Sequence, residues 1–138
     1  MNQARVIFFK IKDNREKVQF ICTKAEEAYR QEKKLLILVP TEEAGQYVDS
    51  LLWRLPESSF LPHLLSKSPA NEWIIITTLA ENLNQAPRLL NLSAEASKIL
   101  HFEDIYEIFD ETAPDKLQAS KEKIASYQAS GINPILPF

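Results

Sequence analysis

Short, almost continuous runs of apolar residues alternate along this chain with longer segments of helical periodicity. The clearest runs are residues 34–40 (KLLILVP) and 73–78 (WIIITT), and residues 5–10 (RVIFFK) are similar. A strand that is covered on both faces has this pattern, which is typical of parallel sheets. Strands that alternate with helices favour an α/β fold with parallel neighbours. We therefore predict an α/β domain in which a mostly parallel, twisted sheet is flanked by helices.

The remaining elements follow from spacing and from end signals. Two further strands are expected at residues 89–92 and 104–109, and helices at residues 15–33, 42–53 and 114–130. Thr41 is placed as an N-cap, and Pro114 suits the first turn of the last helix. Gly131 follows that helix, where a residue without a Cβ fits a left-handed cap. Residues 51–65 (LLWRLPESSFLPHLL) leave the second helix and contain two prolines, which predicts a connection that is neither regular helix nor central strand.

Length, composition and charge narrow the class of protein. A chain of 138 residues that is 45% hydrophobic suits a single domain over residues 1–138, in which residues 132–138 can form a flexible tail. The net charge of −3 argues against a protein that grips nucleic acid through its overall field, so contact with DNA is expected to be indirect. Direct binding of single strands stays an alternative, which a steep salt dependence would reveal. No apolar run is long enough to span a membrane, and we expect a cytoplasmic protein.

The residues that usually carry catalysis or bind cofactors are scarce. The only glycines are Gly45 and Gly131, so no phosphate-binding glycine loop can be assembled. His63 and His101 lie far apart, and Cys22 falls on the apolar face of a helix, where a packed thiol is expected. We predict no catalytic residue, no cofactor and no metal. A degenerate nucleotide-binding domain or a nuclease-related enzyme remains the alternative, and binding of ATP or metal would favour it.

Two stretches are candidates for contacts with other proteins. The connection at residues 51–65 carries Trp53, Phe60 and His63, and large apolar side chains on a connection either cover the core or dock a partner. In the last helix the apolar stripe consists of Leu117, Ile124 and Tyr127. Lys121 lies at the edge of that stripe, and Lys116 and Lys123 flank its other side. The alternative for this helix is ordinary packing with lysines that extend toward solvent.

Four stretches together resemble the chi subunit family of the bacterial DNA polymerase III holoenzyme. They are residues 51–65, residues 33–38 with the acidic helix start and Tyr47 that follow, residues 89–96 (LLNLSAEA) and residues 121–133 (KEKIASYQASGIN). The resemblance implies a nucleotide-binding-like topology without a phosphate loop. It also implies a non-catalytic accessory subunit of the clamp-loader assembly. That subunit would bridge the assembly to single-stranded DNA-binding protein, through the acidic C-terminal tail of that protein.

The resemblance also implies two sets of site residues. The acidic tail, which ends in Ile-Pro-Phe, would bind at Lys116, Lys121, Lys123, Ile124 and Tyr127. A psi subunit, or an equivalent clamp-loader protein, would bind at Trp53, Phe60, Leu61, Pro62 and His63. The family usually has an arginine where this chain has Lys121, which offers a point charge in place of a bidentate fork. Ile124 and Ala125 replace an aromatic and basic pair, so the pocket for the tail is expected to differ in shape.

The last residues of the chain resemble the peptide that the family binds. Residues 133–138 read NPILPF, with a Pro-Phe pair like that of the acidic tail. One hypothesis is that this segment folds into the basic pocket, or exchanges between molecules, and competes with the partner. Deletion of residues 136–138 should then tighten binding of the tail peptide. The alternative is coincidence, since no acidic run precedes the Pro-Phe pair.

Overall fold

The computed structural model describes residues 4–54 and 61–138. Its elements, in chain order, are β1 (Arg5–Ile11), α1 (Asn14–Arg30), β2 (Leu35–Leu38), α2 (Glu42–Trp53), β3 (His63–Leu65), β4 (Ile74–Thr77), β5 (Arg88–Asn91), β6 (Asp104–Asp110) and α3 (Pro114–Ala129). The six strands form one sheet in the order β1-β6-β5-β2-β4-β3, and all of its strand pairs are parallel. The predicted α/β fold is therefore confirmed, with a sheet that is parallel throughout the described residues.

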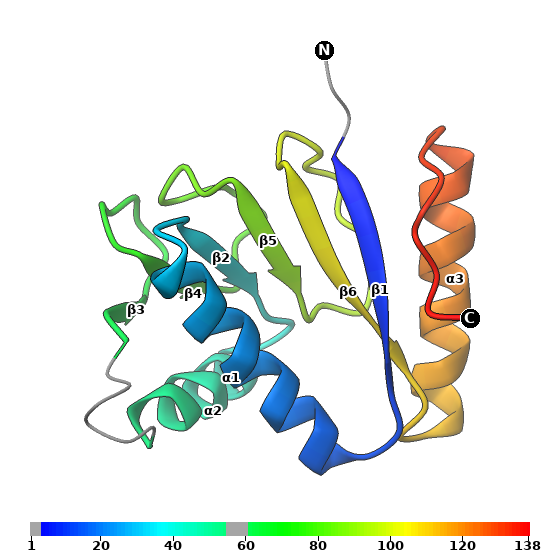
Figure 1. Ribbon diagram of the computed structural model, residues 1–138, viewed down its shortest axis with the longest axis horizontal. Coiled ribbons are helices and arrows are strands. Elements are labelled where there is room, and N and C mark those ends of the chain that lie inside the picture. The colour runs from blue at the N-terminus through cyan, green and yellow to red at the C-terminus, as the bar shows by residue number, and fades with distance from the viewer. Residues whose placement is uncertain (1–3, 55–60) are drawn as a thin grey trace.

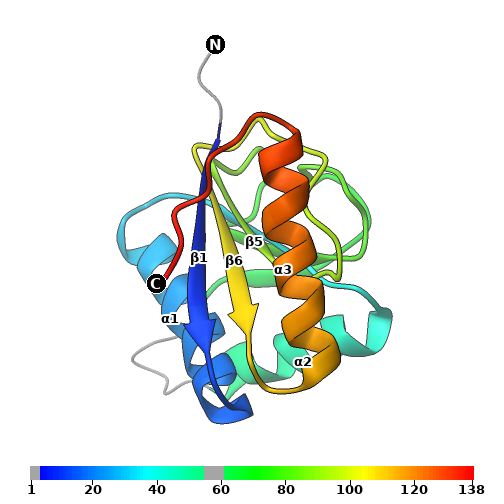
Figure 2. The ribbon, with the colours of Figure 1, turned by 90° about the vertical axis from the view of Figure 1, so that its right-hand side faces the viewer.

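The sheet is buried on both faces at its centre, which explains the continuous apolar runs. Every residue of β2, β4 and β6 is buried. Successive side chains of a strand point to opposite faces, so Leu35 and Ile37 pack in one core cluster and Leu36 and Leu38 in the other. The first cluster lies under α1 and α2, whereas α3 covers the opposite face above β1 and β6 (Figures 1 and 2).

Part of the face that α3 occupies is covered by connections in place of helices. Residues 78–87 connect β4 to β5, which lie on either side of β2, and residues 92–103 connect the neighbours β5 and β6. Neither connection contains a helix. They contribute buried side chains such as Leu83 and Phe102 to the core under α3. Asn84 is also buried, and its amide donates hydrogen bonds to the carbonyls of Leu35 and Glu72, at 3.2 and 3.1 Å. These bonds fix the connection against the start of β2.

The helix ends follow the end signals in the sequence, with one exception. The Thr41 hydroxyl accepts a hydrogen bond from the backbone nitrogen of Ala44 at 3.1 Å, which confirms the predicted N-cap of α2. Pro114 opens α3, and Gly131 follows the helix with a φ of 83°. The first helix was predicted to extend to residue 33, but α1 ends at Arg30. Glu32 then takes a φ of 56°, a left-handed conformation that an α-helix does not tolerate.

The connection at residues 51–65 was predicted to be neither regular helix nor central strand, and its end holds an edge strand that the prediction did not place. His63–Leu65 forms the short strand β3, which pairs with β4 and lies at the edge of the sheet. Pro62 directly precedes β3, a position that proline tolerates because an edge strand does not need every backbone donor. Phe60, which was predicted to contact a partner, lies outside the described residues.

Candidate partner-binding surfaces

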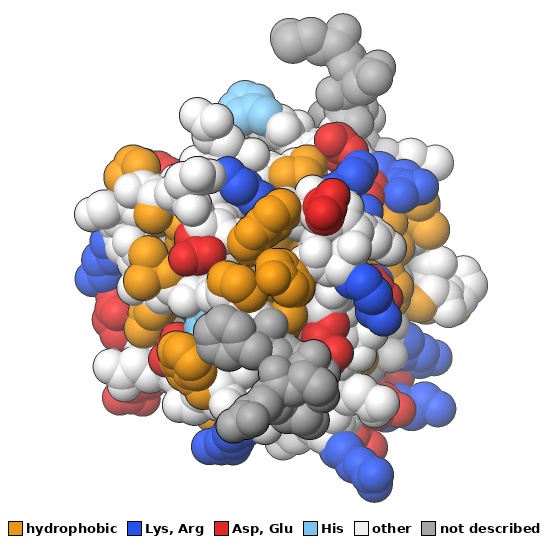
Figure 3. Space-filling view, turned by 60° about the vertical axis from the view of Figure 1, so that its left-hand side comes forward, with side chains coloured by type: hydrophobic (Ala, Val, Ile, Leu, Met, Phe, Trp, Pro, Cys, Tyr) orange, Lys and Arg blue, Asp and Glu red, His pale blue; other side chains and the backbone are white. Residues whose placement is uncertain are grey.

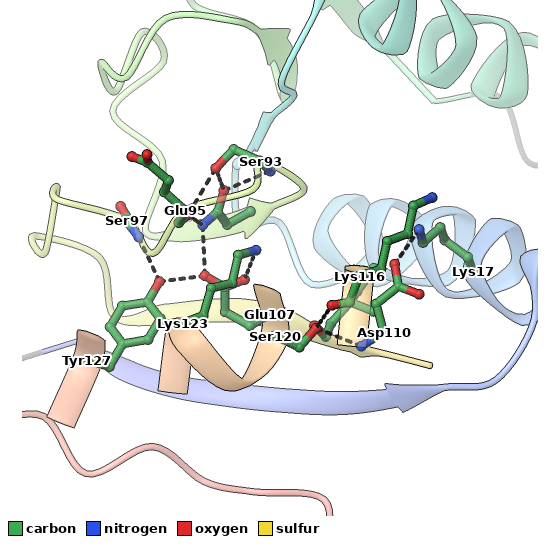
Figure 4. A network of polar contacts seen from close by, with 12 residues as sticks. Lys17, Ser93, Glu95, Ser97, Glu107, Asp110, Lys116, Ser120, Lys123 and Tyr127 are labelled. Atoms are coloured by element: carbon green, nitrogen blue, oxygen red, sulfur yellow. Dashed lines mark hydrogen bonds and ion pairs between the residues drawn. The ribbon is translucent and has the colours of Figure 1, made fainter. Parts of the chain in front are cut away.

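The middle of β6 carries a carboxylate that the sequence analysis did not single out. The Glu107 side chain is fully buried beneath α3. Its Oε1 lies 2.8 Å from Nζ of Lys123, and its Oε2 accepts hydrogen bonds from the Tyr127 hydroxyl at 2.5 Å and from Nδ2 of Asn91 at 2.7 Å (Figure 4). A buried charge needs such partners, because without them its desolvation is not offset. Glu107, Lys123, Tyr127 and Asn91 are called the Glu107 network below.

Burial dominates the protonation behaviour of this network. It raises the pKa of Glu107, and the charge and hydrogen bond of Lys123, with the bonds from Tyr127 and Asn91, oppose that rise. Burial also raises the pKa of Tyr127, and the neighbouring Glu107 adds to that effect. The tyrosine hydroxyl therefore keeps its proton and acts as a donor to the carboxylate.

The Glu107 network also fixes the connection between β5 and β6 to α3. The backbone nitrogen of Ser97 donates to the Tyr127 hydroxyl at 2.9 Å, and Nδ2 of Asn91 donates to the carbonyl of Glu95 at 2.9 Å (Figure 4). The hydroxyl of Ser93 donates to Oδ1 of Asn91 at 2.6 Å. Residues far apart in sequence are thus held against one face of α3.

The first half of α3 is anchored to the end of β6. The Ser120 hydroxyl accepts a hydrogen bond from the backbone nitrogen of Asp110 at 2.9 Å. The Asp110 carboxylate lies 2.5 Å from Nζ of Lys17 on α1 (Figure 4). It also accepts hydrogen bonds from the backbone nitrogen and the hydroxyl of Thr112. Burial alone would raise the pKa of Asp110, but the hydrogen bonds from Lys17 and Thr112 outweigh it and lower that pKa.

The structure divides the five residues predicted to bind the acidic tail. Lys123 and Tyr127 are buried in the Glu107 network, with 7% and 1% of their surfaces exposed. Lys116 and Lys121 are exposed, and Ile124 is partly buried against the core. Lys123 and Tyr127 therefore position the helix, while Lys116 and Lys121 are the members of this set whose ammonium groups reach solvent.

The two exposed lysines lie on different sides of α3. Lys116 and Lys123 line a pocket of about 660 Å³ that lies among α1, α2 and α3, next to the carboxyl ends of β2, β5 and β6. Lys121 and Ile124 are not among the residues that line it. Open parallel sheets often bind ligands at this edge. The two glycines of this chain lie elsewhere, in α2 and after α3, so the pocket has no glycine loop for phosphate.

A second candidate surface lies where α2 meets β3. Trp53 ends α2 with 59% of its surface exposed, and its ring centroid lies 4.7 Å from that of His63. The His63 side chain is buried. Its Nδ1 lies 2.7 Å from the carbonyl oxygen of Leu61, and its Nε2 lies 3.2 Å from Oδ1 of Asp49. The imidazole therefore has a fixed orientation beneath the exposed indole.

Four of the five residues predicted to bind a psi-like subunit are described: Trp53 ends α2, and Leu61, Pro62 and His63 lie at the start of β3. Leu61 is buried, Pro62 is partly buried, and Leu64 beyond them is 41% exposed. Figure 3 shows hydrophobic side chains gathered on the side of the molecule that carries β3 and α2. Exposed apolar surface of this kind is typical of protein contacts.

The described residues offer little support for a metal site or for a reactive thiol. Residues 4–54 and 61–138 contain no group of three or more His, Cys, Asp or Glu side chains arranged to hold a metal ion. Cys22 is half-buried, and burial raises the pKa of its thiol, with a smaller contribution from Glu26. A thiol with a raised pKa is a poor nucleophile.

No helix in the described part of the chain is long and apolar enough to cross a membrane.

The fold is that of an all-parallel α/β domain without a phosphate-binding glycine loop. Its two candidate surfaces carry exposed lysines on α3 and an exposed tryptophan at the end of α2. Residues 3–134 match the family described as DNA polymerase III chi subunit, HolC, and the chain therefore belongs to the DNA polymerase III chi subunit family.

Two curated relatives have the same name. The DNA polymerase III subunit chi of Pseudomonas aeruginosa is 28% identical over 131 residues, which cover 93% of this chain and 92% of the relative. The DNA polymerase III subunit chi of Escherichia coli is 27% identical over 122 residues, which cover 83% of this chain and 80% of the relative. The resemblance seen in the sequence is thereby confirmed, and the chain is placed among proteins of DNA replication.

Proposed function

We propose that this protein is a non-catalytic adaptor that connects the clamp-loader assembly of the replicase to single-stranded DNA-binding protein. One observation carries the proposal: the exposed Lys121 and the exposed Trp53 belong to α3 and α2, which cover opposite faces of the sheet (Figures 1 and 2). Two partners can therefore bind at once without competing for the same surface.

The chemistry of α3 supports binding of an acidic C-terminal tail. Lys121 lies four residues after Leu117 and three before Ile124, so the three share one flank of the helix, and both apolar side chains pack against the core. An exposed ammonium beside an apolar flank suits a peptide that has aspartates or a terminal carboxylate next to an aromatic ring. In this proposal Lys116 adds positive charge, and Lys123 and Tyr127 hold the helix in place from below.

The chemistry of the other surface supports docking of a psi subunit or an equivalent clamp-loader protein. Trp53 offers a large apolar surface, and its neighbour His63 is fixed by Leu61 and Asp49. Tryptophan is the residue most enriched among those that dominate protein interfaces. We propose that Trp53, with Leu61, Pro62 and His63, forms the docking surface. The proposal for Phe60 rests on the sequence resemblance alone.

The proposed role requires no direct contact with DNA. A net charge of −3 disfavours neutralisation of phosphates by the protein as a whole. In this account the protein reaches DNA only through single-stranded DNA-binding protein, and it works in the cytoplasm, where the bacterial chromosome is replicated.

Replacement of Lys121 with glutamate tests the tail site. We expect the dissociation constant for a labelled acidic peptide ending Asp-Ile-Pro-Phe to rise about tenfold or more, because a hydrogen bond to a charged group contributes about 1.5–3 kcal/mol. Fluorescence anisotropy at low and moderate salt measures the change. Arg30→Glu is the matched control, since it alters the net charge equally at an exposed position of α1, on the other face of the sheet.

Equal weakening by Lys121→Glu and Arg30→Glu would show that the peptide senses only the net charge, which would contradict a site on α3. Absence of saturable binding by the unaltered protein would contradict the proposed role toward single-stranded DNA-binding protein altogether.

A further inference from the structure

Residues 132–138 lie along the free edge of β1, beside α3 (Figure 2). The backbone nitrogen of Ile135 donates to the carbonyl of Val6 at 2.8 Å, and that of Phe8 donates to the carbonyl of Ile135 at 2.9 Å, as in a parallel strand. Pro137 has no backbone donor, which prevents the pairing from continuing regularly beyond it. The segment is thus an extended peptide bound to a sheet edge by two hydrogen bonds.

The side chains of this segment rest on the same apolar surface as one flank of α3. Leu136 is partly buried against the core cluster that Leu117 and Ile124 also contact. The Phe138 ring lies edge-on to that of Phe109, with centroids 5.2 Å apart, and 73% of Phe138 stays exposed. Phe138 is therefore held on one side only, and we expect it to leave the surface easily.

We propose that this surface is the groove that receives the acidic tail, and that residues 135–138 occupy it until the tail displaces them. The groove consists of the outer edge of β1, Phe109 and the Leu117–Ile124 flank of α3. The inference rests on the proposed function and deepens it, because it names the binding surface and a competitor within the chain. The bound segment shows which peptides fit: extended ones with a bulky apolar residue and then Pro-Phe.

Charge gives the incoming tail its advantage over the resident segment. Residues 132–138 (INPILPF) contain no acidic side chain that could pair with a lysine. Lys121, exposed on the flank between Leu117 and Ile124, is available to the aspartates of an acidic tail. The tail would therefore reproduce the apolar and backbone contacts of the segment and add ion pairs to them. The advantage of the acidic tail over the segment should shrink at high salt, because salt screens the ion pairs that only the tail makes and leaves the apolar contacts of both unchanged.

Two variants that loosen the segment test the competition. Deletion of Leu136–Phe138 and the milder Phe138→Ser are each expected to tighten binding of the labelled acidic peptide, the deletion by about tenfold if the groove is open in about a tenth of the unaltered molecules. Asn133→Ala, at an exposed position of the same segment, is the control and should change nothing. A free peptide of sequence Asn-Pro-Ile-Leu-Pro-Phe should displace the acidic peptide from the deletion variant. Circular dichroism verifies that each variant is folded. If the deletion variant is unfolded, the affinity of Phe138→Ser for the acidic peptide tests the competition.

The outcomes separate this inference from the proposed function. If the unaltered protein binds the acidic peptide and the loosened variants bind it equally or more weakly, the shared groove is excluded and the adaptor role stands. If no variant binds the peptide, the adaptor role falls and the shared groove with it. If the segment exchanges between two copies, light scattering will show a dimer, and this excludes competition within one molecule.

Discussion

Replacement of Lys123 with methionine is expected to lower the free energy of unfolding by about 3–5 kcal/mol, because the Glu107 carboxylate would stay buried without its cation. Both side chains are almost inaccessible, with 8% of Lys123 and none of Glu107 exposed. The hydrogen bonds from Tyr127 and Asn91 would remain, but neither of these groups carries a positive charge. Urea denaturation of the variant and of the unaltered protein measures the difference.

Two controls isolate the buried pair. The double variant Glu107→Leu/Lys123→Met removes both charges, and we expect it to recover most of the lost stability. Lys121→Met removes an exposed lysine from the same helix and should cost no more than about 0.5 kcal/mol. Similar small losses for Lys123→Met and Lys121→Met would contradict the burial of the pair.

The pH dependence gives the same prediction a second readout. Burial raises the folded-state pKa of Glu107 above its ordinary value of 4.5, so the folded protein holds this proton more tightly than the unfolded chain. The resulting stabilisation is fully present below the ordinary pKa and is lost as pH rises through the raised one. The lost cation matters most when Glu107 is ionised. The deficit of Lys123→Met should therefore grow from acidic to neutral pH.

Replacement of Trp53 with alanine is expected to weaken binding to a psi subunit, or an equivalent clamp-loader protein, by about 30-fold or more, the effect of a residue that contributes at least about 2 kcal/mol to an interface. Because 59% of Trp53 is exposed, the variant should lose little stability. Calorimetric titration with the partner measures the affinity. Tyr47→Ala is the matched control, since Tyr47 is an aromatic residue of the same helix with 52% of its surface exposed.

Equal affinities for the Trp53→Ala variant and the unaltered protein would remove the docking role from this surface. A similar loss of affinity in Tyr47→Ala would show that the partner contacts α2 along its length and that Trp53 does not dominate the binding.

The strands and helices could be predicted because their local signals agree with the fold. Continuous apolar runs occur only where both faces of the sheet are covered, and the ends at Thr41 and Gly131 have local physical causes. Strand β3 was missed because three residues at a sheet edge, next to Pro62, have no periodicity of their own. Its position comes from pairing with β4, which local sequence does not encode.

The site was harder to predict, because burial decides which lysine is accessible. In the sequence Lys121 and Lys123 both flank the apolar stripe of the last helix, and only the packing of α3 on β6 makes the first exposed and the second a partner of Glu107. One signal was present: Glu107 lies in the middle of the apolar run IYEIF, and a charge in a fully buried strand must find a partner. The identity of that partner needed the fold.

The bridging role is tested most directly by whether a psi subunit is retained on DNA that is coated with single-stranded DNA-binding protein. Immobilised single-stranded DNA is covered with single-stranded DNA-binding protein, and labelled psi subunit, or an equivalent clamp-loader protein, is added with or without this protein. The account predicts retention of the label only when this protein is present, and loss of retention with either Lys121→Glu or Trp53→Ala. Equal retention without this protein, or unchanged retention with both variants, would contradict an adaptor with two separate binding surfaces.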